Sequence, residues 1–193
     1  MSNLNAAYWQ NRYAQNDFPW DIGHTNKVLT NYVEQNVAKD DHILIPGAGS
    51  GYEAEYLWNK GYIHVYALDY AADAKALLVN RVSNFPADQY LTGDFFELDQ
   101  RFDIILEQTF FCALNPILRP HYVDQMHRLL NNEGVLFGLL FEMDQLDGPP
   151  YGGNIAEYKD LFEPTFELKT MQKCLDSIAP RLGKELIIEF FKK

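Results

Sequence analysis

Three glycines in the stretch ILIPGAGSGYEAE, residues 43 to 55, could let a nucleotide approach the backbone closely. A strand-like apolar run leads into Gly47, Gly49 and Gly51, and a helix-like segment follows them. Glycine suits such a turn because a side chain there would block the ligand, and because glycine tolerates positive φ. The two ligands that such a turn could serve are a dinucleotide and an adenosyl sulfonium compound.

The spacing of the glycines bears on the choice between these ligands. The dinucleotide fingerprint G-x-G-x-x-G requires a glycine at position 52, where this chain has Tyr52. Asp69, at the end of the next strand-like run, can accept both ribose hydroxyls of either ligand, so it does not discriminate between them. The glycine pattern alone therefore argues against a dinucleotide but does not exclude it.

Acidic residues also follow two later strand-like runs. TGDFFEL places Asp94 and Phe95 where an adenine could receive one polar and one apolar contact. DIILEQTFF brings Glu107 and Gln108 to the same expected edge of the sheet. A phosphate would instead favour positive charge or open helix N–H groups. Together the carboxylates favour a neutral or cationic nucleoside ligand, although each one alone could be an ordinary residue of a strand-end turn.

Aromatic residues crowd the N-terminal stretch AAYWQNRYAQNDFPWDIG. It contains Trp9, Tyr13, Phe18 and Trp20, and the first two are spaced to share one helical face. One interpretation is a helix that packs its aromatic stripe on the edge of the sheet. The other is an aromatic cover over a cation, which gains about 0.5 to 2 kcal/mol over a tryptophan or tyrosine ring. A sulfonium is such a cation, whereas a nicotinamide pyrophosphate is not.

The elements that must position these residues alternate along the chain. Helical patterns occur at about 25–38, 51–60, 71–83 and 120–131, and strand-like runs at 42–46, 64–69, 89–94, 102–107, 134–142, 166–171 and 185–191. This alternation predicts an α/β fold with a doubly wound, mostly parallel sheet of seven strands. The last strand-like runs follow each other without a long helix, which predicts an antiparallel strand at one edge.

Length and composition narrow the class of protein. With 193 residues and 47% hydrophobic residues, the chain suits one domain over residues 1–193. The net charge of −11 disfavours nucleic acid, and no apolar run is long enough to span a bilayer. The two cysteines and five histidines show no metal-ligand spacing. We therefore expect a cytoplasmic protein without a metal, and the sequence does not reveal its oligomeric state.

Six blocks of the sequence, in order, resemble one protein family. They are YWQNRYAQNDFPWDIG, ILIPGAGSGYEAEYL, ALDYA, GDFFEL, EQTFFCALNP and GPPYG. The chain is similar to the thiopurine S-methyltransferase family, and within it to the halide and thiol methyltransferases. The resemblance implies a class I, Rossmann-like methyltransferase fold that uses S-adenosylmethionine and a small-molecule methyl acceptor.

The resemblance also implies roles for particular residues. The N-terminal segment of about residues 1–38 would cover the cofactor. The residues that would bind the cofactor are Trp9, Tyr13, Trp20, Gly47, Gly49, Asp69, Asp94, Phe95 and Glu107. Gln108 would lie near the transferred methyl group as the candidate catalytic residue. The halide and thiol enzymes commonly have tyrosine at this position, and thiopurine enzymes often have arginine.

The expected reaction needs little acid–base machinery. A soft anion such as a thiolate or iodide can attack a methyl sulfonium in line without a general base, so a dry, aligned site is sufficient. Phe110 and Phe111 would form an apolar acceptor pocket, and Tyr151 would close it from a loop with hinges at Gly152 and Gly153. Two alternatives stay open: a protein that binds the cofactor without turnover, and a nicotinamide-dependent oxidoreductase.

Overall fold

The computed structural model describes residues 4–193, which form two compact units. The first unit ends at Leu98, and the second begins at Asp99. Each unit has its own sheet strands and helices, and each is described by itself. The single domain expected over the whole chain, including the first three residues that lie outside the described part, stays a prediction.

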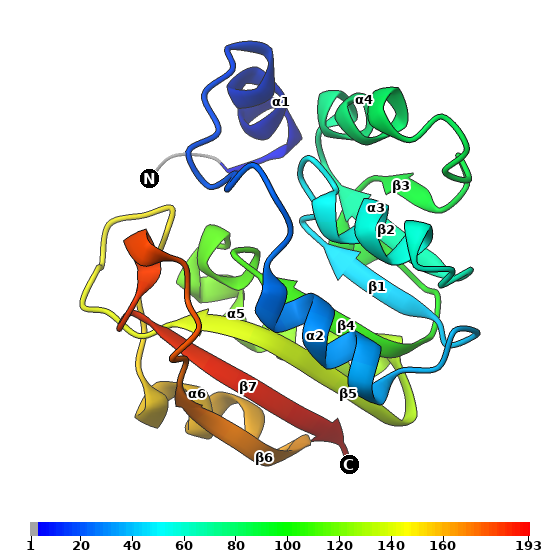
Figure 1. Ribbon diagram of the computed structural model, residues 1–193. Coiled ribbons are helices and arrows are strands. Elements are labelled where there is room, and N and C mark those ends of the chain that lie inside the picture. The colour runs from blue at the N-terminus through cyan, green and yellow to red at the C-terminus, as the bar shows by residue number, and fades with distance from the viewer. Residues whose placement is uncertain (1–3) are drawn as a thin grey trace. The chain divides into compact units, whose positions relative to one another are not determined.

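The first unit is a small parallel α/β arrangement. Its strands have the order β3-β2-β1, with parallel pairing between neighbours. Helices α3 and α4 connect these strands and pack on β2, while α1 packs against α4 (Figure 1). The elements are α1 (Ala6–Ala14), α2 (Lys27–Asn36), β1 (Ile43–Pro46), α3 (Tyr52–Asn59), β2 (Val65–Asp69), α4 (Ala72–Arg81), β3 (Tyr90–Thr92) and the short 3₁₀ helix η1 (Phe95–Glu97).

The second unit is a mixed α/β arrangement. Its strands have the order β4-β5-β7-β6; β4 and β5 are parallel, and β7 is antiparallel to both of its neighbours. The elements are β4 (Phe102–Gln108), η2 (Phe111–Ala113), η3 (Pro116–Leu118), α5 (Arg119–Leu129), β5 (Leu130–Phe141), α6 (Ile155–Phe162), β6 (Phe166–Lys173), η4 (Ala179–Arg181) and β7 (Glu185–Lys192).

The expected α/β class and the mostly parallel, seven-stranded sheet with one antiparallel strand are confirmed. The antiparallel strand is β7, the last strand of the chain. It is paired on both sides, between β5 and β6, so β6 takes the outer position that we expected for the antiparallel strand. Antiparallel neighbours can be joined by a short connection, which explains why no long helix separates β6 from β7.

The structure contains two helices that lie outside the helical ranges expected from the sequence. The first is α1, which begins after Asn5, whose side chain accepts a hydrogen bond from the Tyr8 N–H. The second is α6, where Asn154 caps the N–H of Glu157 in the same way. Both caps are ordinary helix-start signals, and asparagine is among the preferred residues for them. The asparagine caps were therefore the signal in the sequence for the start of each helix.

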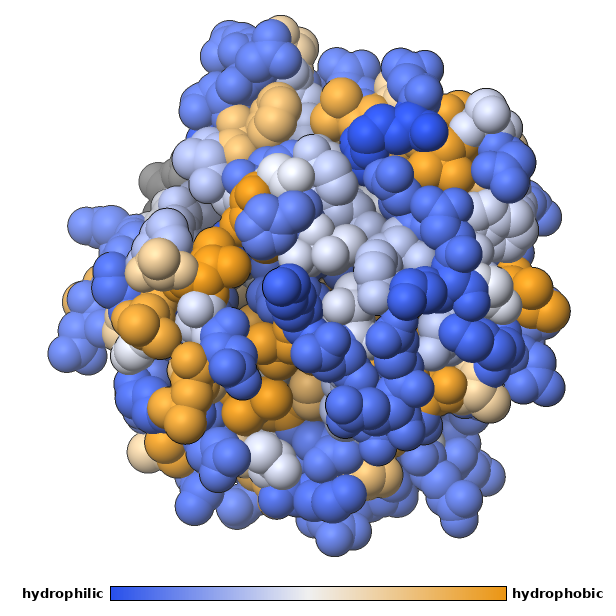
Figure 2. Space-filling view, viewed as in Figure 1, coloured by the Kyte–Doolittle hydropathy of each residue, from blue (hydrophilic) through white to orange (hydrophobic). Residues whose placement is uncertain are grey.

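The core and the surface of the chain differ sharply in chemistry. The residues of β1 are all buried, and in the second unit Phe162 makes ring contacts with Phe111, Phe166 and Phe190. Hydrophilic residues cover most of the face shown in Figure 2, in keeping with the net charge of −11. No helix within residues 4–193 has the length and apolar character needed to cross a membrane.

Candidate functional site

The glycine turn of the first unit has the backbone conformation that its sequence predicts. Gly47, Gly49 and Gly51 have φ values of 63°, 54° and 73°. These values lie in the left-handed region, which side chains other than glycine rarely adopt. The N–H of Ala48 donates to the carbonyl of Leu68 on β2, at 2.9 Å, and fixes the turn to the end of that strand.

Asp69, at the end of β2, holds the turn from the opposite side. Its Oδ2 accepts a hydrogen bond from the N–H of Gly49 at 2.9 Å, and its Oδ1 accepts one from Ala71 at 2.9 Å. Burial raises the pKa of Asp69, and these two N–H donors oppose that rise. Because each carboxylate oxygen has two lone pairs, Asp69 can accept further hydrogen bonds from a ligand while it holds the turn.

Two side chains that the sequence did not single out hold the carbonyl groups of the turn. The buried hydroxyl of Tyr90 donates to the carbonyl of Gly49 at 2.8 Å, and Arg81 donates to the carbonyl of Ser50. Tyr90 and Arg81 lie 41 and 31 residues from their partners in the chain. No local pattern could reveal such contacts, because they depend on how β3 and α4 return to the turn.

The aromatic residues of the N-terminal segment form one cluster next to the turn. The rings of Trp9 and Trp20 meet edge to face at 5.3 Å, and Tyr13 stacks on Phe18 at 5.3 Å. The indole N–H of Trp20 donates to the hydroxyl of Tyr13 at 3.3 Å. A Cβ atom added to Gly49 would lie 3.0 Å from that same hydroxyl. The structure therefore brings Trp9, Tyr13 and Trp20 together, with Tyr13 and Trp20 close to Gly49.

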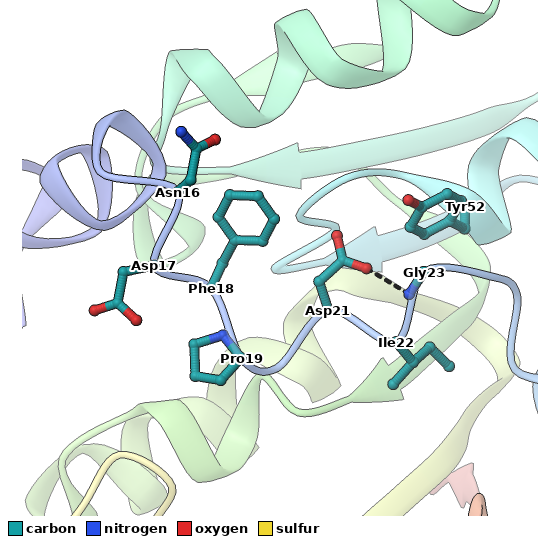
Figure 3. A pocket seen from close by; sticks show the side chains of 8 residues that line it. All are labelled: Asn16, Asp17, Phe18, Pro19, Asp21, Ile22, Gly23 and Tyr52. Atoms are coloured by element: carbon teal, nitrogen blue, oxygen red, sulfur yellow. Dashed lines mark hydrogen bonds between the residues drawn. The ribbon is translucent and has the colours of Figure 1, made fainter.

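Asp21 fastens the segment that follows this cluster. Its carboxylate accepts hydrogen bonds from the Ser50 hydroxyl and from the N–H of Gly23. An open cavity of about 570 Å³ lies beside it, lined by Asn16, Asp17, Phe18, Pro19, Asp21, Ile22, Gly23 and Tyr52 (Figure 3). The two carboxylates in this lining make the cavity unsuitable for a phosphate.

Asp94 and Phe95 follow β3 as expected, beside the end of β2. The pairing of Asp69 with Thr92 places the ends of the two strands next to each other. Asp94 accepts a hydrogen bond from the N–H of Phe96 at 2.8 Å and so begins the short helix η1. Phe95 is buried. Asp94 therefore has a local structural function that does not depend on any ligand.

Glu107, in the second unit, is a fully buried carboxyl group. One of its oxygens accepts hydrogen bonds from the N–H groups of Phe110 and Phe111, at 2.9 and 3.0 Å, and the other accepts one from the hydroxyl of Tyr122. Burial raises the pKa of Glu107 to about 7, and the three donors oppose that rise. Glu107 thus holds the turn that follows β4.

This turn has an unusual backbone conformation next to Gln108. Thr109 has a φ of 57°, in the left-handed region that β-branched residues rarely adopt. Its hydroxyl donates to the carbonyl of Gln108 at 2.7 Å. Phe110 is partly buried, whereas Phe111 is buried among the rings of Tyr122, Tyr158 and Phe162. Such strain persists only where surrounding contacts hold it, which is the role of Glu107 here.

The loop that contains Tyr151 is closely packed. The N–H of Tyr151 donates to the carbonyl of Cys112, after β4, at 2.7 Å. A Cβ atom added to Gly152 would collide with the carbonyl of Met143, and one added to Gly153 would collide with the Tyr158 hydroxyl. Glycine is needed at both positions because neighbouring atoms leave no room for a side chain. The expected role of these two glycines as hinges stays a prediction.

Metal ligands do not gather in the described part of the chain. Among residues 4–193, no group of three or more His, Cys, Asp or Glu side chains is arranged to hold a metal ion. The two cysteines, Cys112 and Cys174, are free and buried.

Comparison with known proteins identifies the family. The family model described as Thiopurine S-methyltransferase (TPMT) matches residues 4–192. Probable thiol methyltransferase 2 of Arabidopsis thaliana is 32% identical over 192 residues, which cover 96% of this chain and 84% of that protein. Thiocyanate methyltransferase 1 of Brassica oleracea is 28% identical over 184 residues, covering 92% and 81%.

A solved structure agrees with the fold described above. It is the 1,6-didemethyltoxoflavin-N1-methyltransferase of Burkholderia thailandensis, with bound 1,6-didemethyltoxoflavin and S-adenosylhomocysteine. The two chains superpose with a TM-score of 0.72 at 18% identity, covering 97% of this chain and 86% of that one. Since the family model spans nearly the whole sequence and a relative above 30% identity covers it as fully, this chain belongs to the thiopurine S-methyltransferase family.

Proposed function

We propose that this chain transfers the methyl group of S-adenosylmethionine to a small soft nucleophile, with a thiol as the first candidate. The enzyme class, a methyltransferase that uses this cofactor, follows from membership of the family. The identity of the acceptor and the roles of individual residues are proposals, and they rest on the geometry of the two units.

The observation that carries the proposal is the way Asp69 holds the glycine turn. Its carboxylate accepts a hydrogen bond from the N–H of Gly49, so this N–H cannot also bind a phosphate ligand. The carboxylate still has lone pairs that can accept hydrogen bonds from hydroxyl groups. A ribose diol without a pyrophosphate fits this arrangement. We propose that Asp69 binds the ribose of the cofactor, and that Gly47 and Gly49 allow its methionine portion to approach the backbone.

The aromatic cluster suits the cationic part of the same cofactor. Bound S-adenosylmethionine supplies an electrophilic methyl group on a positively charged sulfur. Trp9, Tyr13 and Trp20 present aromatic faces and edges within one cluster, with Tyr13 near Gly49. An aromatic face near a desolvated cation stabilises it by about 2 kcal/mol or more. We propose that these three residues cover the cofactor, while Asp94 and Phe95 contact its adenine.

The turn after β4 supports the acceptor part of the proposal. Gln108, Phe110 and Phe111 offer one neutral amide and two rings, without a charged side chain among them. A thiolate can attack the methyl group without a general base, so the residues need to align the sulfur and exclude water. We propose that Gln108 contacts the reacting atoms, and that Phe110, Phe111 and Tyr151 shape the acceptor pocket.

Glu107 has a different proposed role from these neighbours. Both of its oxygens already accept hydrogen bonds from protein groups. We propose that it acts on the region near the transferred methyl group through the turn of residues 108 to 111, which it holds in place. A direct contact with the cofactor would require one of its remaining lone pairs to reach the ligand.

The relatives make a thiol the first acceptor to test. The printed names of two of them concern thiol and thiocyanate methylation. The test is a methyl-transfer assay with labelled S-adenosylmethionine against hydrosulfide, an aryl thiol, a thiopurine, thiocyanate and iodide, with products identified by mass spectrometry. We expect the highest kcat/KM for one of the thiols.

Two results would change this proposal. Product only from a halide would replace the thiol by a different soft nucleophile. Tight S-adenosylhomocysteine binding without product from any of the five acceptors would favour a protein that binds the cofactor without turnover. A parallel thermal-shift measurement with NAD and with S-adenosylmethionine checks the remaining alternative, since only the cofactor that binds should raise the Tm.

A further inference from the structure

Arg119, the first residue of α5, is a buried arginine in the second unit. Its side chain is 4% exposed. Arginine is almost never fully buried unless it is paired, because removing a charge from water is costly. The partners of this guanidinium therefore explain why it is tolerated, and they show which segments it joins.

The guanidinium of Arg119 contacts three segments, two of which are distant from it in the sequence. Its Nη1 forms an ion pair with Glu157 in the first turn of α6. Its Nη2 donates to the carbonyl of Gly152 at 2.7 Å, and its central carbon lies 4.8 Å from the centre of the Phe111 ring. One side chain thus connects the loop that contains Tyr151 with the turn after β4.

The two segments joined by Arg119 also contact each other directly. The N–H of Tyr151 donates to the carbonyl of Cys112, and the N–H of Gly152 donates to the carbonyl of Gln145 at 2.8 Å. The two peptide groups on either side of Tyr151 are therefore anchored by Cys112 and Gln145, and Arg119 anchors the next one, between Gly152 and Gly153. The backbone of this part of the loop is therefore fixed at three points, and the side chain of Tyr151 is half-buried.

Only arginine can make these contacts together. Its planar fork presents two Nη groups at a fixed angle and a flat face for stacking, whereas lysine has one compact ammonium group. The Nε of Arg119 has no hydrogen-bond partner among the described residues. Its position therefore follows from the two Nη contacts and the Phe111 ring, at the cost of one unsatisfied buried donor.

We infer that Arg119 is a positioning residue for the acceptor side of the active site. By joining Phe111 to Gly152, it holds the turn that carries Gln108 and Phe110 and the loop that carries Tyr151 in one arrangement. The inference rests on the proposed function, because it takes those residues to contact the acceptor. It adds a residue outside the six sequence blocks that revealed the family.

The test compares Arg119→Lys with Arg128→Lys in the same helix. Arg128 is an exposed arginine that pairs with Asp99, so its replacement controls for the general effect of the substitution. Four quantities are measured for each variant and the wild type: kcat, KM for the acceptor, Kd for S-adenosylhomocysteine and Tm. Assays are run well below the lowest Tm.

We expect Arg119→Lys to lower kcat/KM for the acceptor by roughly tenfold to a hundredfold, because small displacements of positioning groups have effects of this size. The Kd for S-adenosylhomocysteine should stay at the wild-type value, as should all parameters of Arg128→Lys. If Arg119 had only a structural role, Arg119→Lys would lower Tm, and it would change the acceptor kcat/KM and the Kd for S-adenosylhomocysteine to a similar extent. Equal kcat/KM values in the two variants would overturn the inference.

Glu157→Gln provides a second test in case Arg119→Lys does not fold. Glu157 is partly exposed, and its control is Glu163→Gln, at the exposed residue that directly follows the same helix. Loss of the ionic partner should lower acceptor kcat/KM by roughly threefold to tenfold. An unchanged value would contradict the inference. If the wild type itself methylates none of the acceptors, the proposed function fails first, independently of either variant.

Discussion

The two units hold their functional residues in different ways. In the first unit, the glycine turn owes its shape to the backbone: three glycines at positive φ, with Asp69 receiving an N–H of the turn. In the second unit, the turn after β4 owes its shape to buried side chains, above all Glu107 and Arg119. Side chains hold both turns, but only the first turn depends on glycines at positive φ. Its carbonyl groups accept hydrogen bonds from Tyr90 and Arg81. In the second unit, Glu107 instead accepts hydrogen bonds from the N–H groups of its own turn.

This difference has a functional meaning under the proposed division of labour. A cofactor common to many enzymes can be bound by a backbone conformation that only glycine adopts readily. An acceptor pocket specific to one enzyme can be changed by replacing the side chains that hold it. We therefore expect substitutions in the first unit to affect cofactor affinity, and substitutions in the second to affect acceptor kinetics or stability.

The largest expected effect concerns the buried carboxyl of the second unit. Burial raises the pKa of Glu107 from 4.5 to about 7, so the folded chain binds this proton more tightly than the unfolded chain does. Glu107 therefore contributes stability that is fully present below about pH 4.5 and is lost as the pH rises through about 7. A shift of this size corresponds to about 3 kcal/mol.

Urea unfolding between pH 4 and 8 measures this contribution. For Glu107→Gln, the free energy of unfolding should fall less with rising pH than it does for the wild type. The exposed control Glu163→Gln should show the same pH dependence as the wild type. Identical pH profiles for Glu107→Gln and the wild type would show that this carboxyl titrates alike in the folded and unfolded chains. The contrast between the two units would then lose its strongest support.

The next largest effect is expected at the end of β2. Asp69→Ala removes the acceptor of the Gly49 and Ala71 N–H groups and the proposed ribose ligand. Affinity for S-adenosylhomocysteine, measured by calorimetry, should fall roughly a hundredfold, because hydrogen bonds to a carboxylate contribute about 1.5 to 3 kcal/mol each. Asp73→Ala, on the exposed face of α4, should leave the affinity unchanged. A change confined to acceptor KM would reverse the proposed division.

A smaller effect is expected at Gly49, where a pair of variants distinguishes backbone strain from a lost contact between the glycine turn and the ligand. Gly49→Ala forces a side chain into a φ of 54° and towards the hydroxyl of Tyr13, whereas Gly61→Ala meets a φ of 84° with no atom nearby. Left-handed backbone costs about 1 to 2 kcal/mol in both variants. Only Gly49→Ala should also weaken S-adenosylhomocysteine binding, by roughly tenfold. Equal affinities in the two variants would show that the turn does not contact the ligand.

The smallest expected effect is at Tyr151. Its N–H donates a hydrogen bond to the carbonyl of Cys112, so Tyr151→Phe should leave the loop in place. The substitution should remove one hydroxyl contact to the acceptor. The acceptor KM should rise by roughly threefold, while the Kd for S-adenosylhomocysteine should stay at its wild-type value. A parallel loss of acceptor and cofactor binding would contradict the assignment of Tyr151 to the acceptor side.

The parts of the molecule that could be predicted from the sequence are those with local causes. The glycine turn, the strand that precedes it and the acid at the end of β2 follow from residue type and spacing, and the alternation of elements gave the α/β class. The roles of Tyr90 and Arg119 could not be predicted, because their hydrogen-bond partners lie 33 to 41 residues away. The crowding at Gly152 and Gly153 could not be predicted for the same reason, because the atoms that crowd these glycines belong to Met143 and Tyr158. Their expected role as hinges stays a prediction.

The order of the two units along the chain has a consequence for synthesis. Every hydrogen bond described around the glycine turn joins residues before position 98, and all residues proposed to face the acceptor come later. At roughly 5 to 20 residues per second, a ribosome needs on the order of ten seconds to add the second unit. During translation, the segment proposed to bind the methyl donor therefore exists for seconds before the segment proposed to choose its recipient.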